Sequence, residues 1–318
     1  MKTILTGSIA FDYLMRFPGY FKECILPEHL DKISLSFLVD DMVKQYGGVG
    51  ANIAYTMALL GERPYLFSTV GQDFPEYARR LESLGVDTSG VKIIPDKFTA
   101  SFFATTDLSN AQIASFYTGA MADSAELLLS ESGYERNDFV MISPTDPRAM
   151  ERYIDEAQQL NLHSLFDPGQ QIIRMGAETL RRGITSAYGL FVNEYEFQLL
   201  QKHSGLSESE ILDHPEFAVV TLGKNGARLH SRAEDIHVPI IEDAKVVDPT
   251  GVGDAFRGGF MCGYMRGKSL KLCGEIGTTT AAFCISQNGP QNHKFTIDEF
   301  KHYFRQYFDD QGQLDDLD

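Results

Sequence analysis

The sequence predicts an α/β protein, a three-layer α/β/α sandwich whose central sheet is mostly parallel, accompanied by a small separate β-sheet. Short apolar strands alternate with amphipathic segments, which is typical of parallel strands joined by helical crossovers. Aromatic, alternating segments at 11–41 and 98–118 interrupt this rhythm. At 318 residues the chain is near the size at which one hydrophobic core stops growing, so we expect one large domain with a smaller appendage.

The regular elements follow one another along the chain, and glycines at 61 and 85 mark the ends of the first two helices. A run with strand character, 244–247, precedes a glycine turn late in the chain. The acidic stretch 309–316 is expected to be frayed. Core strands are predicted at 2–9, 64–70, 139–142, 164–166, 189–192 and 218–221, and helices at 52–60, 74–84, 255–265 and 271–286.

The two interrupting segments read as hairpins, and residues 107–110 form the turn between strands 99–106 and 111–117. Such strands either form a separate small sheet over the edge of the main sheet or extend the main sheet in antiparallel fashion. We favour the separate sheet. The predicted organisation is therefore a large domain from 1–10, 42–97 and 119–305, a β lid from 11–41 and 98–118, and an acidic tail from 306–318.

Composition narrows the class of protein. Hydrophobic residues make up 43% and charged residues 23% of the chain, which is ordinary for a globular protein. A formal net charge of −16 argues against binding to nucleic acid or to an anionic membrane surface. The chain starts without a long apolar leader and contains no stretch of membrane-spanning length, so we expect a cytoplasmic protein. Cys24, Cys262, Cys273 and Cys284 are spaced too loosely for a disulfide framework. The last three recur every eleven residues and are expected to be small buried residues in adjacent helices, the alternative being a metal site.

Residues 248–260 carry the strongest chemical signal, because a glycine turn, a helix start and an acid coincide there. Backbone N–H groups of Gly251, Val252 and Gly253 at the positive end of a helix would stabilise a polyanion. A carboxylate at Asp254 repels a phosphate, so its position makes sense if it accepts a proton from an attacking hydroxyl. The alternative is a helix N-terminus with an acid in its first turn. The spacing excludes a dinucleotide fingerprint and a P-loop, and phosphoryl transfer is the favoured interpretation.

Two weaker motifs lie near the N-terminus. The glycine-rich entry 47–52 lets backbone approach a ligand, and Asn52 offers a donor and an acceptor to hydroxyls. Asp12 can accept hydrogen bonds from two neighbouring hydroxyls, as a ribose presents them. Taken alone, residues 47–52 can also be interpreted as a tight turn, and Asp12 as a solvent-facing acid in a loop.

The string Asp-x-Thr-Gly-x-Gly-Asp-Ala-Phe at 248–256 resembles the C-terminal signature of the ribokinase-like (PfkB) sugar and nucleoside kinases. Segments 7–12 and 47–52 resemble the substrate signature of that family, in the expected order. The resemblance implies a ribokinase-like fold in which the small sheet is a lid, and a homodimer formed through that lid. It also implies that residues 193–196 organise Mg²⁺, with Asn193 and Glu196 acting on the metal indirectly. It further implies that Thr221–Gly226 is a nucleotide-binding loop, so the residues expected to contact ATP are Asn193, Thr221, Gly223 and Gly226.

Adenosine kinases of the actinobacterial type are further resembled by the strings at 7–10, 14–19, 26–30, 35–41, 111–117, 119–121 and 167–171. Gly169 stands where the wider family often has Asn. Stacking on an aromatic ring suits a nucleobase, whereas a sugar has no π face. The alternative is that the aromatic rings at 102, 103, 116 and 117 form only the core of the lid. The resemblance implies that Ser8, Asp12, Gly48 and Asn52 hold the ribose, that Phe102 and Phe116 sandwich the purine, and that Ser36, Gln112, Met121, Gln170, Gln171 and Arg174 line the nucleoside pocket.

The reaction expected from these motifs is the ATP-dependent phosphorylation of the 5′-hydroxyl of adenosine to AMP, a step of purine salvage, with Asp254 as the base and Gly251–Gly253 as the anion hole. Resemblance to some relatives adds a K⁺ site near Asp248 and Thr250. The alternatives are a related kinase for another nucleoside or a free sugar (inosine, guanosine, ribose or fructose) and a catalytically silent nucleoside-binding regulator.

Overall fold

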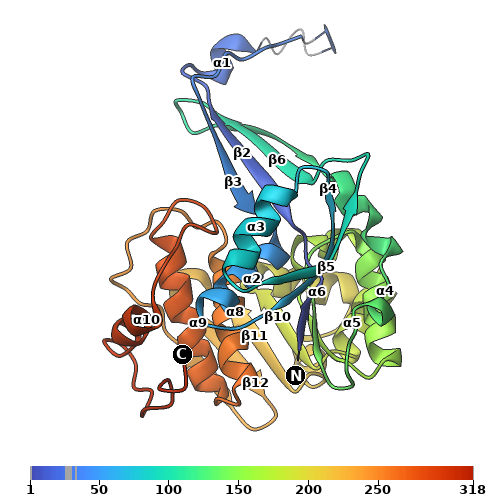
Figure 1. Ribbon diagram of the computed structural model, residues 1–318, viewed down its shortest axis with the longest axis vertical. Coiled ribbons are helices and arrows are strands. Elements are labelled where there is room, and N and C mark those ends of the chain that lie inside the picture. Colours follow the sequence, from blue (N-terminus) through green and yellow to red (C-terminus); the bar gives the residue numbers. More distant parts are fainter. Residues whose placement is uncertain (1, 26–30, 33, 318) are drawn as a thin grey trace.

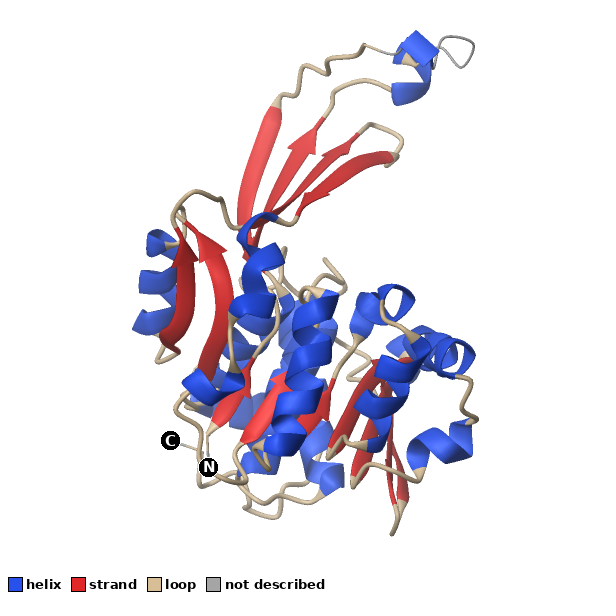
Figure 2. Ribbon diagram, turned by 90° about the vertical axis from the view of Figure 1, so that its right-hand side faces the viewer, coloured by secondary structure: helices blue, strands red, loops and turns tan. Residues whose placement is uncertain are grey.

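The computed structural model describes residues 2–25, 31–32 and 34–317. Residues 26–30 and 33 of the predicted lid segment therefore lie outside the described residues. Two sheets are present in the described part of the chain, a large one of nine strands and a small one of four. Figure 2 shows the small sheet projecting from one end of the helix-covered body.

The large sheet has the order β13-β12-β11-β10-β9-β8-β1-β4-β5 within the described residues. Strands from β11 to β5 run parallel, and β12 and β13 continue the sheet as antiparallel neighbours. Their bounds are β1 (Thr3–Leu5), β4 (Tyr65–Gly71), β5 (Asp87–Ile94), β8 (Phe139–Ile142), β9 (His163–Phe166), β10 (Gly189–Asn193), β11 (Phe217–Thr221), β12 (Ala227–Ser231) and β13 (Asp235–Val238).

Helices cover both faces of this sheet, so the predicted three-layer α/β/α architecture is confirmed (Figure 1). Alternate strand residues enter different cores, as at Ile4 and Leu5. One core packs against α4–α7 and the other against α2, α3, α8 and α9. The helices are α1 (Phe21–Cys24), α2 (Val49–Leu59), α3 (Pro75–Ser83), α4 (Pro147–Gln159), α5 (Ala177–Thr185), α6 (Glu194–Ser204), α7 (Glu208–Leu212), α8 (Val252–Met265), α9 (Leu270–Ile285) and α10 (Ile297–Phe304).

The small sheet has the order β3-β2-β6-β7, with β2 (Ala10–Arg16), β3 (Asp41–Gly47), β6 (Ala100–Thr106) and β7 (Gln112–Tyr117). It is a separate sheet, as predicted, and Asp107–Asn110 forms the turn between its last two strands. Its strand β3 continues to Gly47, past residue 41, where the lid segment was expected to end. Pairing with β2 over its whole length holds those extra residues in the small sheet.

Two predicted strands differ from the structure. The segment 244–247 is irregular, and it lines the cleft described below instead of joining a sheet. The predicted strand 2–9 is only three residues long, because the chain leaves the large sheet after Leu5 and enters the small sheet at Ala10. Between the two, Ser8 N–H donates to the carbonyl of Pro144 at 2.9 Å, so residues 6–9 bridge the body and the small sheet.

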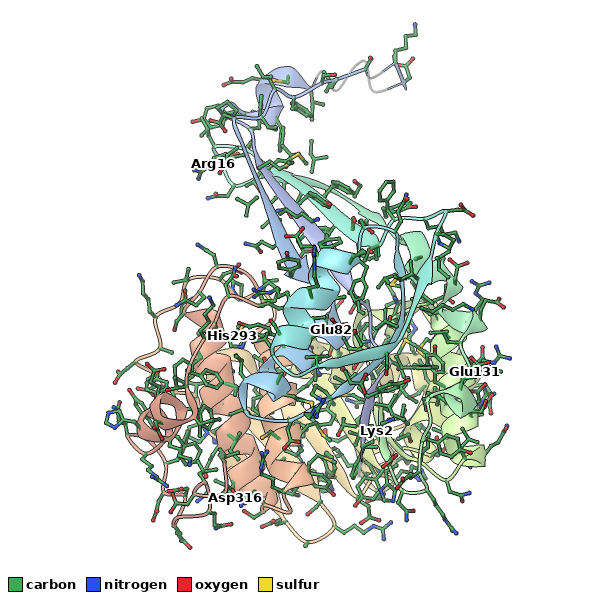
Figure 3. The ribbon with its side chains drawn as sticks, viewed as in Figure 1. Lys2, Arg16, Glu82, Glu131, His293 and Asp316 are labelled. Atoms are coloured by element: carbon green, nitrogen blue, oxygen red, sulfur yellow. The ribbon has the colours of Figure 1, made fainter. Side chains whose placement is uncertain are left out.

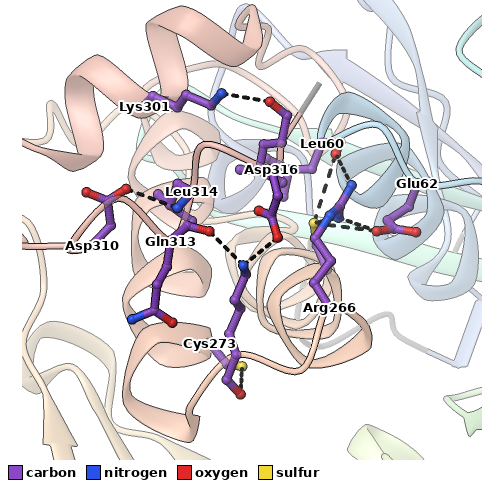
Figure 4. Close-up of polar contacts among 12 residues, drawn as sticks. Leu60, Glu62, Arg266, Cys273, Lys301, Asp310, Gln313, Leu314 and Asp316 are labelled. Atoms are coloured by element: carbon purple, nitrogen blue, oxygen red, sulfur yellow. Dashed lines mark hydrogen bonds and ion pairs between the residues drawn. The ribbon is translucent and has the colours of Figure 1, made fainter.

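The acidic C-terminal tail is packed, and the prediction that it is frayed was wrong. Leu314 is 0% exposed and Leu317 is 2% exposed, in a third apolar cluster with residues of α8, α9 and α10. Lys268 Nζ contacts Asp316 and the carbonyl of Gln313. Figure 4 shows these two tail residues beside Leu314. The acids that suggested disorder therefore pair with basic groups of the body, and two of the intervening side chains are apolar anchors.

The cysteines at 262, 273 and 284 are buried as free thiols, as predicted, while Cys24 is half-buried. No group of metal-ligating side chains large enough to hold an ion on its own occurs in the described ranges. Among residues 2–25, 31–32 and 34–317, no helix combines the length and the apolar character needed to cross a bilayer.

Candidate active site

The carboxyl ends of the parallel strands meet the first turn of α8. Gly251 caps that helix with φ of 76°, a left-handed conformation that favours glycine. A side-chain carbon at this position would lie 2.3 Å from Cβ of Pro290, so the turn also requires close approach of the loop after α9. Asp254 follows within the first helical turn.

Asp254 is partly accessible although densely surrounded by protein. Asn52 Nδ2 donates a hydrogen bond to its Oδ2 at 2.8 Å. Burial raises the pKa of Asp254 to about 6, and the positive charge of Arg257 and the hydrogen bond from Asn52 act against that rise. A carboxylate with this pKa is ionised at neutral pH yet basic enough to accept a proton in a reaction.

Arg257 lies below the glycine turn as a buried cation. Its Nη2 donates to Asp167 Oδ1 at 2.7 Å and lies 4.0 Å from Glu196 Oε2. A side-chain carbon at Gly253 would lie 2.9 Å from Arg257 Nη1, so the guanidinium supports the turn directly. Burial opposes the charge of Arg257, but the acids at 167, 254 and 196 outweigh it and raise its pKa.

The backbone N–H groups predicted to bind an anion are not equivalent. Val252 N–H makes a long hydrogen bond of 3.4 Å to the carbonyl of Pro249, so it is less available to donate to a ligand. Gly251 and Gly253 precede the first internal hydrogen bond of α8, which joins Ala255 N–H to the Gly251 carbonyl at 2.8 Å. Their donors therefore stand at the positive end of a 14-residue helix.

A cleft of about 790 Å³ opens beside this turn. The predicted nucleotide loop lines it, since Thr221, Gly223 and Gly226 are at the carboxyl end of β11 and just beyond. Its other wall is largely apolar and includes Ile240, Val246, Ala281 and Ile285. The cleft is thus lined by apolar side chains on one wall and by Val252 and Gly253 at the start of α8, a lining that suits an apolar base and an anionic group.

Asn193 also lines the cleft, and it caps α6. Its Oδ1 accepts the N–H of Glu196 at 2.8 Å, while Glu196 Oε2 accepts the N–H of Asn193 at 2.8 Å. This is a reciprocal capping box, which accounts for both side chains by helix capping alone. Burial raises the pKa of Glu196. Each side chain retains oxygen lone pairs of the type that Mg²⁺ accepts through water, so the pair fits an indirect role.

The inner face of the small sheet carries the predicted nucleoside contacts. Asp12 is directly opposite Phe102 in the β2–β6 pair, and Phe102 is directly opposite Phe116 in the β6–β7 pair. Directly paired residues share one face of a sheet, so the acid and both rings form one row. Phe116 is 50% exposed, which leaves its ring open to a ligand. Burial raises the pKa of Asp12 to about 6, with the charge of Asp248 acting in the same direction.

This face lies over the loops next to α8. A side-chain carbon at Gly289 would lie 2.5 Å from Oε1 of Gln45, and Gln45 is the β3 partner of Asp12. Gly289 N–H and Thr250 N–H both donate to the carboxylate of Asp248, at 2.8 and 2.9 Å. The base of the small sheet and the turn before Asp254 are therefore in contact.

Three further predicted residues lie at the junction of the two sheets. Ser8 Oγ accepts the N–H of Val49 at 3.2 Å. Gly48 has φ of 92°, and a side-chain carbon there would lie 2.6 Å from the Ser8 carbonyl oxygen, so no other residue fits. Met121 is buried against Ala10 and Ala100 at the foot of the small sheet.

Other predicted pocket residues are not brought to this row. Ser36 is exposed beside Phe37, which packs on Phe17 and Phe21 beyond the outer end of the small sheet. Figure 3 marks that end at Arg16, far from the body. Gln112 shares the face of Phe116 but lies at the same outer end, with Nε2 3.3 Å from Thr106 Oγ1.

The segment after β9 contributes the remaining predicted residues. Gly169–Arg174 is a short 3₁₀ helix, in which Gln171 is buried while Gln170 and Arg174 are exposed. Gln171 Oε1 is buried without a hydrogen-bond partner in the described chain, which suits a group that awaits a ligand.

Sequence reasoning missed Gln291, Tyr77 and Gln45 and did not assign Asp167 a role. Gln291 Nε2 donates to Asn52 Oδ1 at 2.9 Å, so both ends of the Asn52 amide have protein partners. Gln291 follows a Gly-Pro pair, a context that predicts only a turn. The contact between Gln291 and Asn52 joins residues 239 positions apart, so no local sequence pattern could predict it.

Comparison with known proteins agrees with this geometry. The family model described as pfkB family carbohydrate kinase matches residues 19–296. A nucleoside kinase of Methanocaldococcus jannaschii is 31% identical over 300 residues, covering 94% of this chain and 95% of that protein. A cytidine kinase of Thermococcus kodakarensis is 28% identical over 267 residues, covering 82% and 95%.

Among solved structures, a Burkholderia thailandensis nucleoside kinase in complex with inosine superposes with a TM-score of 0.86 at 34% identity, covering 96% of this chain and 97% of that one. The fold, the order of the motifs and the extent of these matches agree. The chain belongs to the pfkB family of carbohydrate kinases and has the ribokinase-like fold.

Proposed function

We propose that this chain transfers the γ-phosphoryl group of ATP to the 5′-hydroxyl of a purine nucleoside, with adenosine as the acceptor and AMP and ADP as products. One observation carries the proposal: Asp12, Phe102 and Phe116 lie in a row on the face of the small sheet that meets the turn before Asp254. A carboxylate suits a ribose diol and an aromatic ring suits a base.

Asp254 is the proposed general base. Its pKa of about 6 keeps it ionised at neutral pH, and its position in the first turn of α8 puts it next to the donors of Gly251 and Gly253. The 5′-hydroxyl gives its proton to Asp254 while its oxygen attacks the phosphorus. Charge that develops on the transferred group is stabilised by the glycine N–H donors and by the helix dipole.

The nucleoside is proposed to stack on the exposed ring of Phe116. Because Phe102 and Phe116 are direct cross-strand neighbours on one face, they offer the base two adjacent rings instead of the two opposite walls of the expected sandwich. Asp12 then takes the ribose hydroxyls, with Ser8, Gly48 and Asn52 at the foot of the lid. The M. jannaschii and T. kodakarensis relatives are named as kinases of nucleosides, which supports this class of acceptor.

The remaining predicted contacts require the lid to move. Ser36 and Gln112 lie at its outer end, whereas Gln170, Gln171 and Arg174 belong to the body. We propose that they meet the nucleoside when the small sheet closes over the site, which would also exclude water from the transfer.

ATP is proposed to occupy the cleft along Thr221–Gly226, and Mg²⁺ would reach the phosphates with Asn193 and Glu196 acting through water. The ion would supply neutralisation of phosphate charge. A K⁺ ion is proposed near Asp248 and Thr250. Both oxygens of Asp248 already accept backbone N–H groups there, which holds its negative charge against the turn.

A coupled ADP-release assay tests the proposal with adenosine, inosine, guanosine, cytidine, ribose and fructose as acceptors. We expect adenosine to give the highest kcat/KM and free sugars to be at least tenfold poorer, because they cannot stack. Inosine is the strongest rival, since the B. thailandensis relative was solved with it. Turnover of a sugar at the rate of nucleosides would overturn the assignment, and absence of turnover with every acceptor would favour a nucleoside-binding regulator.

We also propose a homodimer formed through the lid. On the outer face, Met42, Phe103, Ile113 and Tyr117 are between 37% and 59% exposed. A second copy would bury these apolar side chains. Sedimentation equilibrium should give twice the monomer mass, and Ile113→Lys should return the protein to a monomer.

A further inference from the structure

The hydrogen bond between Asn52 and Asp254 is the last link of a chain of polar contacts that starts at a backbone carbonyl. The hydroxyl of Tyr77 donates to the carbonyl of Gly47 at 2.9 Å. Gln291 Nε2 donates to the hydroxyl oxygen of Tyr77 at 2.5 Å and to Asn52 Oδ1 at 2.9 Å. Asn52 Nδ2 then donates to Asp254 Oδ2 at 2.8 Å.

The direction of this chain is determined at its start. A carbonyl oxygen only accepts, so the hydrogen of Tyr77 is committed to Gly47, and its oxygen faces Gln291 as an acceptor. Burial raises the pKa of Tyr77, which keeps that hydrogen in place. Gln291 must then present its NH₂ group, and the second hydrogen of that group requires the oxygen of Asn52. The nitrogen of Asn52 is left for Asp254.

Gln291 is held in this orientation at a cost. It is 2% exposed, and its Oε1 has no hydrogen-bond partner in the part of the chain that the structure describes. An unpaired buried amide oxygen destabilises a folded protein. This orientation of Gln291 is therefore explained by the two hydrogen bonds that its NH₂ group donates. Arg80 donates to the backbone carbonyl of Gln291 at 2.6 Å and anchors the loop from α3.

We propose that Gln291 is a positioning residue for phosphoryl transfer, because it orients the amide of Asn52 so that an N–H group holds Oδ2 of the Asp254 carboxylate. The inference rests on the proposed role of Asp254 as the base. Within the described residues, hydrogen bonds to Asp254 reach Oδ2, so Oδ1 is left to face the incoming hydroxyl. Without Gln291, the Asn52 amide can turn its oxygen toward the carboxylate, which disfavours the ionised form.

The other charged or titratable groups around Asp254 do not depend on Gln291. Arg257 approaches from the same helix, Asp167 from the end of β9, Glu196 from α6 and the thiol of Cys284 from α9. Within the described residues, the hydrogen bonds of Gln291 run to Arg80, Asn52 and Tyr77, and none reaches these four side chains. A change in the titration of Asp254 can then be attributed to the Asn52 amide.

Gln291→Met is the principal test, because methionine has a similar volume but no N–H donor. We expect the acidic limb of the kcat–pH profile to move up by about one pH unit. Activity below the limb should fall roughly tenfold, while activity at high pH returns to within about twofold of the parent and KM for the nucleoside changes by less than about threefold. Asn292→Met is the matched control, since Asn292 is exposed and donates to the Asn288 carbonyl outside the chain of contacts.

A second variant and a second readout separate positioning from folding. Tyr77→Phe removes the acceptor that orients Gln291, and it should move the limb in the same direction by a smaller amount. In both variants, ¹³C NMR of the Asp254 carboxyl without substrate should show a higher pKa than in the parent. An unchanged carboxyl titration in both, with activity lost evenly at every pH, would show that Gln291 has only a structural role.

The same measurements distinguish this inference from the proposed function. If the parent protein phosphorylates nucleosides and the titration of Asp254 is unchanged by Gln291→Met, the positioning role fails and the function stands. If the parent phosphorylates no nucleoside, the proposed function fails. The positioning role in phosphoryl transfer then fails with it, even if the titration shows that the Gln291–Asn52 contact orients the carboxyl group of Asp254.

Discussion

Arg257 and Asp167 form a buried ion pair, with Nη2 of the arginine 2.7 Å from Oδ1 of the aspartate. The pair joins the first turns of α8 to the carboxyl end of β9, between residues 90 positions apart. Ser143 Oγ donates to the other carboxylate oxygen at 2.9 Å. Because Asp254 is on the same part of α8, this ion pair fixes the proposed base relative to the central sheet.

Arg257→Met should destabilise the protein strongly. The substitution leaves Asp167 as a buried charge without its cation, so the free energy of unfolding should fall by about 3–5 kcal/mol. Urea unfolding measures the change. Arg182→Met is the control, because Arg182 pairs with Glu151 and Asp155 at the surface and should cost less than about 1 kcal/mol. Equal losses in the two variants would contradict the role of the buried pair.

Asp254→Asn should lower kcat by roughly 10²–10⁴ while nucleoside binding survives, because an amide keeps the shape of the side chain but cannot accept the proton. ADP release measures turnover, and calorimetric titration with adenosine measures binding. Asp243→Asn is the matched control, since that acid is exposed and accepts a hydrogen bond from the hydroxyl of Tyr307, away from α8. Near-normal turnover of Asp254→Asn would remove the proposed base.

The pH dependence of kcat should report the ionisation of Asp254. Its pKa is raised to about 6, and the reaction needs the ionised form, so kcat should be level above that pH and fall tenfold per unit below it. An unperturbed aspartate would place the fall near pH 4. Stopped assays between pH 4.5 and 8.5 measure the profile, with coupling enzymes kept out of the reaction. A level rate down to pH 5 would contradict the assignment.

Phe116→Leu should weaken nucleoside binding and leave free sugars unaffected. Loss of stacking costs about 1–3 kcal/mol per base, which raises KM for adenosine roughly 5- to 150-fold if KM follows binding. Phe103→Leu is the matched control, because Phe103 lies on the opposite face of β6 and stacks on Tyr13 with ring centroids 4.9 Å apart. A larger effect at 103 than at 116 would reverse the assignment of the two faces.

Leu314→Ala should destabilise the protein by about 2–5 kcal/mol, although it lies in an acidic tail. The side chain is 0% exposed, so its truncation leaves a cavity in the cluster under α10. Thermal and urea unfolding measure the effect. Gln313→Ala, one residue away and exposed, should change stability by less than about 0.5 kcal/mol.

The elements that sequence reasoning located are those defined by local pattern. Strand 139–142 is a continuous apolar run, and the helix from 255 to 265 consists of apolar, aromatic or small residues apart from Arg257. The turn at 107–110 follows from Asp107, whose Oδ1 accepts N–H groups from Ser109 and Ala111. Such signals act over a few residues, so one sequence is enough to detect them.

The features that were missed depend on partners far away in the chain. Strand β3 belongs to the small sheet as far as Gly47 because β2 pairs with it there, and its alternation alone does not say which sheet it joins. The tail is ordered in part because Lys268 pairs with Asp316 and Arg305 pairs with Asp310. Likewise, Gln291 gains its partners only when the loop after α9 reaches α2 and α3.

The packed tail also has a consequence for how the chain matures. Leu60, next to the end of α2, shares an apolar cluster with Leu314 and Leu317. Helix α2 is made early in synthesis, whereas Leu314 and Leu317, which cover Leu60, are made more than 250 residues later. A nascent chain therefore exposes this apolar surface until residues 314–317 have been made, and a chain that lacks them should depend on chaperones.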